Sequence, residues 1–201
     1  MASYRSSRVV PVALVLIIIA VAIAALVSLA RAVFFPSDQS STSQTDTSHE
    51  TLVSLAVDNS VTMTVRGSIV ADEDFHSYQI KVTPTARTLI TYVGYLDNKV
   101  DEIAFGNNTP AYEQFVYALD RASLVKGTEL TGDSNDTRGI CASGRVYEFE
   151  LFKGDKSIKK LWTTSCKGSL KGSLVANIDQ LSSLFKKQIP GGDKIIGKIR
   201  L

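Results

Sequence analysis

The chain has 201 residues, of which 44% are hydrophobic and 21% are charged, so its composition is that of a globular protein and not of a disordered polar chain. Two histidines and two cysteines are a poor supply of ligands for a metal site, and we find no motif for a cofactor or for sequence-specific nucleic-acid recognition. The formal net charge at pH 7 is +2, but the charges are distributed unevenly along the chain.

The first apolar segment is long enough to span a membrane. From Val9 to Ala30 there are 22 residues without a charge, and as a helix they would extend about 33 Å, slightly more than the hydrocarbon core of a bilayer. Arg5 and Arg8 precede this segment, which favours a cytoplasmic N-terminus. We therefore expect residues 1–8 in the cytoplasm, a transmembrane helix over 9–32 in the cell membrane, and the rest of the chain outside.

A cleaved signal peptide is the alternative interpretation of the same segment. Ala30-Arg31-Ala32 has the small-x-small pattern of a cleavage site, which would place the cut after Ala32. The apolar region of a signal peptide usually has about 7–15 residues, so the longer run observed here favours an anchor that is retained.

The segment 33–50 is predicted to be a disordered stalk. Ser37 to Glu50 holds 14 residues with no apolar side chain, and eight of them are Ser or Thr. Such a segment cannot bury enough apolar surface to offset the entropy lost on ordering. Residues 51–201 remain, which is the usual length of one domain with a core of its own.

Patterns of apolar side chains predict strands and helices in this domain. Apolar and polar residues alternate over 61–66 and over 78–83, as expected for strands with one buried face. The apolar run Leu89 to Leu96 is typical of a central strand. Two helices are expected, one from Thr109 to a stop at Gly127 and one from Leu174 to Gln188. The predicted fold is α+β: an antiparallel sheet of about five strands with two helices on one face, preceded by one transmembrane helix.

A hairpin lies between the two cysteines, Cys141 and Cys166. The strands are expected at Arg145 to Phe152 and Ile158 to Thr164, with Gly154-Asp155 as a two-residue loop. This loop makes the numbers of paired residues sum to 309, so that Leu151 faces Ile158, Tyr147 faces Trp162, Glu150 faces Lys159 and Cys166 faces Ser143.

The cysteines would then lie just beyond the strand ends, close enough for a disulfide. A location outside the cytoplasm permits oxidation. Two free thiols and a metal or redox pair are the alternatives, and the Cys-x-x-Cys spacing of a redox pair is absent.

No set of residues forms a recognisable catalytic or metal site. His49 falls in the predicted stalk, and His76 stands alone at the start of a strand, without a nucleophile nearby in the sequence. The acidic turn Asp72-Glu73-Asp74 offers few convergent oxygens, and the segment Asp133 to Thr137 has Arg138 where a calcium loop needs glycine. We therefore expect no catalytic, cofactor-binding or metal-binding residues.

The C-terminal quarter is strongly basic. Residues 51–152 hold 8 Lys/Arg and 14 Asp/Glu, a net charge of −6, whereas residues 153–201 hold 11 Lys/Arg and 3 Asp/Glu, a net charge of +8. One interpretation is that the two halves interleave and neutralise each other. The other is a basic face that attracts an anionic envelope polymer or protein. The residues predicted to bind an anion are Lys167, Lys171, Lys186 and Lys187.

The domain resembles single-pass envelope proteins of small-genome, host-associated bacteria of the Saccharibacteria type. The resemblance covers about residues 60–190 and rests on Arg138 to Gly144, Leu161 to Cys166 and Gln188-Ile-Pro190. It implies a shared topology and a disulfide, but no activity. The sequence favours a membrane-anchored, non-enzymatic binding or assembly domain at the cell envelope; an envelope hydrolase and an accessory subunit of a membrane complex are the alternatives.

Overall fold

The computed structural model describes residues 18–19, 47–167, 172–199 and 201. The chain divides into two compact units, Met1–Thr45 and Asp46–Leu201, and the second holds the folded domain. Apart from residues 18–19, the predicted anchor lies outside the described residues, and so does the predicted stalk up to residue 46. Within the part of the chain that the structure describes, no helix has the length and apolar character needed to cross a membrane.

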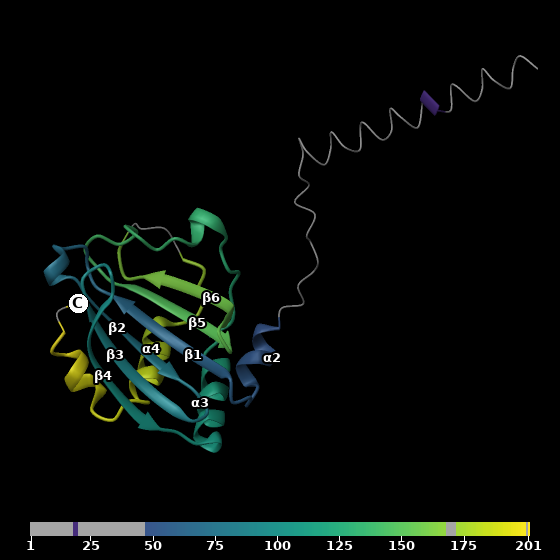
Figure 1. The fold of residues 1–201 in the computed structure, drawn as a ribbon, viewed down its shortest axis with the longest axis horizontal. Helices are drawn as coiled ribbons and strands as arrows, with labels where there is room; N and C mark the ends of the chain where they lie inside the picture. Colours follow the sequence, from purple (N-terminus) through teal and green to yellow (C-terminus); the bar gives the residue numbers. More distant parts are fainter. Residues whose placement is uncertain (1–17, 20–46, 168–171, 200) are drawn as a thin grey trace, which may run out of the picture. The chain divides into compact units, whose positions relative to one another are not determined.

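The domain is built on a six-stranded antiparallel sheet with strand order β4-β3-β2-β1-β5-β6 (Figure 1). The strands are β1 Asn59–Arg66, β2 His76–Val82, β3 Ala86–Val93, β4 Asn98–Gly106, β5 Val146–Lys153 and β6 Lys156–Thr164. The α+β class is confirmed, but the sheet has one strand more than predicted. The unpredicted strand is the edge strand β4, whose side chains are mostly exposed and therefore carry no apolar pattern.

The strand predicted as central is not central. β3 lies second from the edge and ends at Val93, and only Leu89 and Thr91 in it are buried. The middle of the sheet is formed by β1 and β2, whose apolar residues alternate as predicted. The apolar run after Val93 continues into an exposed turn, where Leu96 is 87% exposed.

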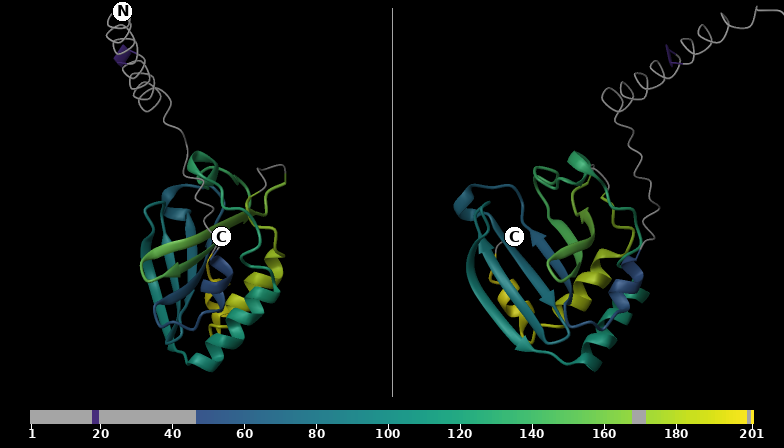
Figure 2. Two further views of the ribbon diagram at one scale, coloured as in Figure 1. Left: turned by 90° about the vertical axis from the view of Figure 1, so that its right-hand side faces the viewer. Right: turned by 45° about the vertical axis from the view of Figure 1, so that its right-hand side comes forward.

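Helices cover one face of the sheet (Figure 2). They are α3 Thr109–Arg121, α4 Ile178–Lys186 and the short α5 Gly192–Ile196; α2 Ser48–Val53 precedes β1 and begins inside the segment predicted as stalk. Single 3₁₀ turns are formed by η1 Asp72–Asp74 and η2 Gly132–Asn135.

Asparagine side chains set the starts of both predicted helices. Asn108 accepts a hydrogen bond from the backbone of Ala111, and Asn177 accepts one from Gln180, each at 3.0 Å. These N-caps satisfy backbone donors that the first helical turn leaves free. The first helix is capped by Asn108 and begins at Thr109 as predicted, but it ends at Arg121 and not at Gly127. The second begins after Asn177 and not at Leu174.

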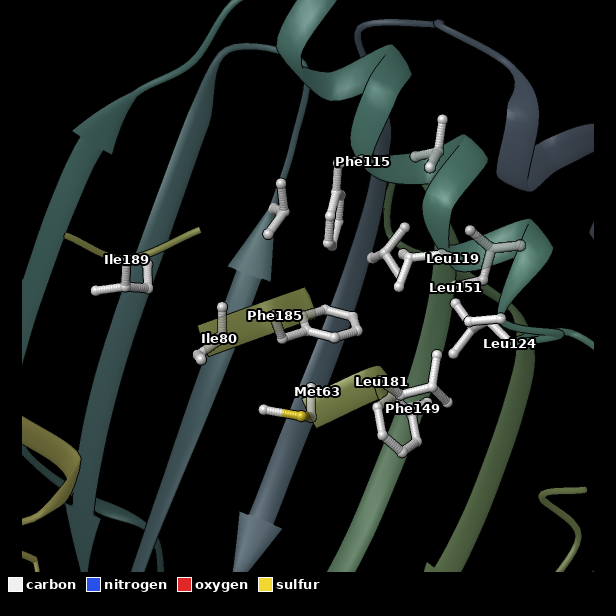
Figure 3. Packing of buried hydrophobic residues seen from close by; sticks show 14 of the residues in the cluster. Met63, Ile80, Phe115, Leu119, Leu124, Phe149, Leu151, Leu181, Phe185 and Ile189 are labelled. Carbon is white, nitrogen blue, oxygen red and sulfur yellow. The ribbon is translucent and has the colours of Figure 1, made fainter. Parts of the chain in front are cut away.

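The core lies between this face of the sheet and the helices (Figure 3). Phe185 of α4 is completely buried and packs edge-on against Phe115 of α3, with ring centroids 5.2 Å apart. It also contacts Phe149 of β5, at 5.8 Å between centroids. Met63 and Ile80 supply the facing surface of β1 and β2 and are completely buried. One aromatic side chain therefore joins both long helices to the sheet.

The β5–β6 hairpin has the predicted turn but a different register along most of its length. Lys153 pairs with Lys156 as expected, but an irregularity between Leu151 and Phe152 shifts the pairing by one residue. Leu151 then faces Lys159 and not Ile158, Tyr147 faces Thr163, and Glu150 faces Lys160. A one-residue bulge moves every following side chain to a new partner, and the sequence pattern alone does not reveal it.

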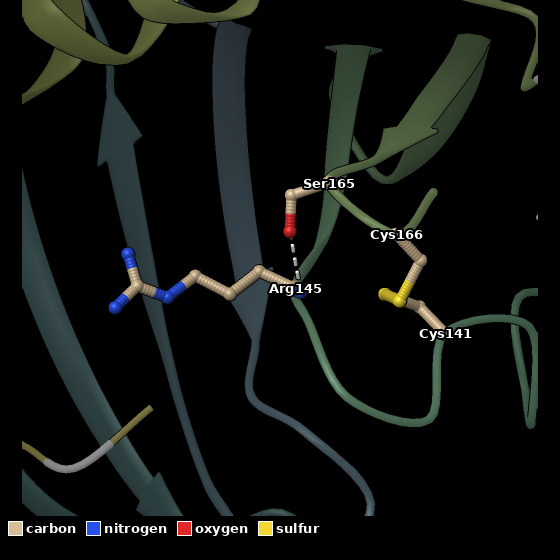
Figure 4. Close-up of a disulfide and its surroundings, with 4 residues drawn as sticks. All are labelled: Cys141, Arg145, Ser165 and Cys166. Atoms are coloured by element: carbon tan, nitrogen blue, oxygen red, sulfur yellow. Dashed lines mark hydrogen bonds between the residues drawn. A yellow bond between two sulfur atoms is a disulfide. The ribbon is translucent and has the colours of Figure 1, made fainter. Parts of the chain in front are cut away.

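Cys141 and Cys166 form a disulfide with their Cα atoms 5.5 Å apart (Figure 4). The predicted pairing is confirmed, although the predicted facing pair of Cys166 and Ser143 depended on the register that the bulge changes. Arg145 and Ser165 close the hairpin next to the disulfide: the backbone N–H of Ser165 donates to the carbonyl of Arg145, and the Ser165 hydroxyl accepts from the N–H of Arg145. A Cβ at Gly144 would lie only 2.9 Å from the sulfur of Cys141, so this position requires glycine.

Candidate functional site

A cavity of about 550 Å³ lies on the face of the sheet opposite α3 and α4. Its floor is made by side chains of β1, β5 and β6 that alternate with the core residues: Arg66, Val146, Glu148 and Lys160. Loops on either side of these strands form the walls. We call this cavity the Arg66 pocket.

A chain of ion pairs crosses the floor of the Arg66 pocket. The guanidinium of Arg66 donates two hydrogen bonds to the carboxylate of Asp97, at 2.8 and 3.2 Å, and its Nε lies 3.5 Å from Glu148. Glu148 is also 3.3 Å from the ammonium of Lys160 and accepts a hydrogen bond of 2.5 Å from the hydroxyl of Thr137. Two cations and two carboxylates therefore balance each other within the pocket.

The arrangement stabilises the charged form of Arg66. Burial would lower the pKa of this side chain, but the hydrogen bond to Asp97 and the charge of Glu148 outweigh burial, and the pKa is raised. The guanidinium is thus held by two carboxylates from different segments of the chain, the turn before β4 and strand β5.

One wall is aromatic. The rings of Phe75 and Tyr95 are stacked with centroids 4.1 Å apart. The Tyr95 hydroxyl donates to the backbone carbonyl of Val70 at 2.7 Å and accepts from the backbone N–H of Val70 at 3.1 Å. These two hydrogen bonds hold the Tyr95 ring in place. The turn that carries Tyr95 needs Gly94, whose φ is +76° and whose Cβ position would be 3.0 Å from the carboxylate of Asp72.

The other wall is the segment from Thr137 to Cys141, which the disulfide attaches to the end of the hairpin. The backbone N–H of Ile69 donates to the carbonyl of Ala142 at 3.0 Å and so joins this wall to the first. Arg138 extends into solvent and forms an ion pair with Asp136. The hydrogen bond from Arg138 holds the pKa of that carboxyl at about 2.

Exposed apolar side chains surround the aromatic side of the Arg66 pocket. They are Ile69 and Val70, 46% and 43% exposed, and Tyr95, 46% exposed. Ile69 and Tyr95 line the cavity itself, and the backbone carbonyl of Val70 accepts a hydrogen bond from the hydroxyl of Tyr95. An apolar rim around a polar floor is typical of a site where a ligand or partner docks.

Only part of the predicted basic set comes together. Lys186 and Lys187 line a second cavity of about 350 Å³, to which Arg145 also contributes. Lys167 is exposed and follows the disulfide, and Lys171 lies outside the described residues. Lys160, also in the basic segment, pairs with Glu148 of the acidic half, as the first interpretation of the charges expects for such residues.

The remaining candidate residues have structural surroundings. His49 belongs to α2 and not to a stalk, with its Nε2 3.2 Å from a carboxylate oxygen of Asp120. The ring of His76 lies 2.8 Å from the backbone carbonyl of Asp74. No group of three or more His, Cys, Asp or Glu side chains suited to a metal ion occurs among the residues that the structure describes.

The Arg66 pocket is not recognisable from the amino-acid sequence. Its floor residues look like ordinary exposed positions of amphipathic strands, and the residues that meet there come from segments up to about 90 positions apart. The one available signal was the run Asp72-Glu73-Asp74, whose first carboxylate accepts from the N–H of Tyr95 and fixes the aromatic wall. No protein-family model and no curated protein matches the chain.

Proposed function

We propose that this chain is a membrane-anchored binding domain of the bacterial cell envelope, held outside the cytoplasm by residues 9–32, and that its ligand enters the Arg66 pocket. The main observation in favour of this proposal is a cavity of about 550 Å³ that combines a floor of paired charges with a wall of stacked aromatic rings. This volume lies within the range of about 300–1,000 Å³ that is usual for ligand sites.

The chemistry of the pocket favours an uncharged polar ligand with one apolar face. Because Arg66 and Lys160 are already paired with Asp97 and Glu148, a charged ligand would have to displace an existing ion pair. The same groups can still exchange hydrogen bonds with hydroxyl or amide groups. A sugar ring of an envelope polymer combines such groups with a face that packs on an aromatic side chain such as Tyr95.

Two features support a location at the envelope. The uncharged run from Val9 to Ala30 is of spanning length. The disulfide between Cys141 and Cys166 fits an oxidising compartment, since such bonds are rare in the cytosol.

The test uses residues 46–201, which form a compact unit with a core of their own. The ¹⁵N-labelled domain is titrated separately with neutral oligosaccharides, anionic wall-polymer fragments and short peptides, and amide chemical shifts are followed. We expect the neutral oligosaccharides to shift amides around Arg66, Tyr95 and Glu148. Shifts confined to other surfaces, or produced only by the peptides, would contradict the proposed ligand class.

A rim substitution with a matched control sharpens the test. Ile69→Glu places a charge on the rim, and because this side chain is 46% exposed the fold should be little affected. We expect ligand affinity to fall by about tenfold, the equivalent of about 1.4 kcal/mol. Val57→Glu makes the same change at another exposed apolar position that does not line the pocket, and it should leave affinity unchanged.

A further inference from the structure

The second cavity lies on the helix-covered side of the sheet, beside α4. It has a volume of about 350 Å³ and contains groups from strands β2 and β5 as well as from both C-terminal helices. The residues that line it are Tyr78, Arg145, Tyr147, Asp179, Ser182, Ser183, Lys186, Lys187 and Asp193.

Three cations meet in this cavity without carboxylate partners. Arg145 has its backbone fixed on both sides by Ser165, and its side chain extends away from the disulfide (Figure 4). Lys186 and Lys187 end α4, where the partial negative charge of the helix terminus favours lysine. Among the described residues none of these three cations forms an ion pair, whereas Arg66, Lys99, Arg138 and Lys160 all do.

Hydroxyl groups complete the set of donors. Ser182 lies one turn before Lys186 on the same face of α4; it is 8% exposed, and its hydroxyl is buried without a hydrogen-bond partner in the described part of the chain. Leaving a buried hydroxyl without a partner is costly, so a water or an anion that hydrogen-bonds to it would stabilise the site. Tyr78 is also buried, and burial raises the pKa of its hydroxyl, so this group stays protonated and able to donate.

Two carboxylates share the cavity and limit what it can hold. Asp179 lies in the first turn of α4 and Asp193 in the first turn of α5. Asp179 is seven residues before Lys186, which is about 10 Å along a helix. Asp193 also lines the cavity, so its negative charge opposes the binding of an anion.

We propose that Arg145, Lys186 and Lys187, together with the hydroxyl of Ser182, form a binding site for a tetrahedral oxyanion such as a phosphate group. Donors from a strand and from a helix converge on one small cavity, and a bound oxyanion gives the buried hydroxyl the acceptor that it lacks. The proposed site contains Lys186 and Lys187, two of the four lysines predicted to bind an anion. It also contains Arg145, which was not among the predicted residues.

The experiment titrates residues 46–201 with sodium phosphate against sodium chloride of equal ionic strength and follows amide shifts by NMR. We expect saturable shifts at Tyr147, Ser182 and Lys186 with phosphate but not with chloride. Arg145→Gln combined with Lys186→Gln should weaken binding by about tenfold or more, since hydrogen bonds to charged groups contribute about 1.5–3 kcal/mol each.

A charge-neutral variant and a charge-matched control separate a built site from diffuse attraction. Ser182→Ala leaves the net charge unchanged and should weaken binding several-fold. Lys194→Gln removes one exposed positive charge beside the cavity and should have no effect beyond general screening. Equal losses in Lys194→Gln and Lys186→Gln, or no saturable shift with phosphate, would overturn the proposal.

Vesicles identify the source of the oxyanion. The domain is floated with phosphatidylcholine vesicles that contain or lack phosphatidylglycerol. If the domain binds phosphate and floats only when both phosphatidylglycerol and Lys186 are present, the site binds lipid headgroups. If it binds phosphate but does not float, the ligand is a soluble phosphate or a phosphate-containing polymer. Ile69→Glu should leave phosphate binding intact, so failure at the Arg66 pocket and failure at this site are distinguishable.

Discussion

Removing the disulfide should destabilise the domain substantially. The bond joins residues separated by 25 positions, and in the chain-entropy treatment a closed loop of about 26 residues stabilises the native state by about 3–4 kcal/mol. Cys141 is 2% exposed, so we choose alanine and not serine to avoid leaving a hydroxyl without a partner in its place. For a domain of this size the double variant Cys141→Ala/Cys166→Ala should lower the Tm by roughly 6–16 °C.

Urea unfolding of residues 46–201, followed by circular dichroism, gives the free energy of unfolding directly. The oxidised protein, the dithiothreitol-reduced protein and the double alanine variant are compared, and the last two should agree. Ser143→Ala, an exposed position inside the same loop, serves as the control and should stay within about 0.5 kcal/mol of the parent. A loss below about 1 kcal/mol on reduction would refute the loop-closure reasoning.

Three further outcomes follow from the core, the surface and the N-terminus. Phe185→Ala should lower the free energy of unfolding, measured in urea, by about 3–5 kcal/mol because it removes the ring that joins both long helices to the sheet. Tyr117 is 45% exposed, so Tyr117→Ala should lower it far less. The pKa of Asp136 is lowered from 3.8 to about 2, so its ion pair with Arg138 should contribute above pH 4 and be lost as the pH falls through about 2. Carboxyl-detected NMR should show that pKa return toward its ordinary value in Arg138→Gln, and an unchanged value would contradict the pairing. Mass spectrometry of the native membrane-extracted chain should detect peptides from residues 9–32, and a mature chain that lacks them would contradict a retained anchor.

The amino-acid pattern was sufficient to recognise the strands β1 and β2 and the two longer helices, each of which buries one face. The alternation in β1 and β2 follows from their position at the middle of a sheet with one helix-covered face. The helix positions were recognised for the same reason, although Asn108 and Asn177 set their starts. Strand β4 was missed because it lies at the edge of the sheet, where exposed side chains have no periodic apolar signal.

The candidate site was harder to predict because it depends on register and on distant pairs. The bulge after Leu151 decides which side chain faces Glu150, and only this register places Lys160 beside Glu148. The ion pair between Arg66 and Asp97 joins a strand to a turn 31 positions away. Charge counts along the chain could suggest basic and acidic halves, but not which lysines find a carboxylate and which remain open.

The start of β5 connects the two proposed sites. Arg145 and Val146 are adjacent in sequence, and because successive side chains of a strand point to opposite faces, Val146 lines the Arg66 pocket while Arg145 lines the cavity beside α4. Ser165 fixes the backbone of Arg145, and the disulfide fixes the segments on either side of that contact. The bond therefore does more than stabilise the fold: it holds one wall of the Arg66 pocket and the backbone of Arg145 in the proposed oxyanion site at the same place. Reduction should accordingly weaken both binding events in protein that is still folded, whereas a purely global stabiliser would leave both affinities unchanged below the unfolding transition.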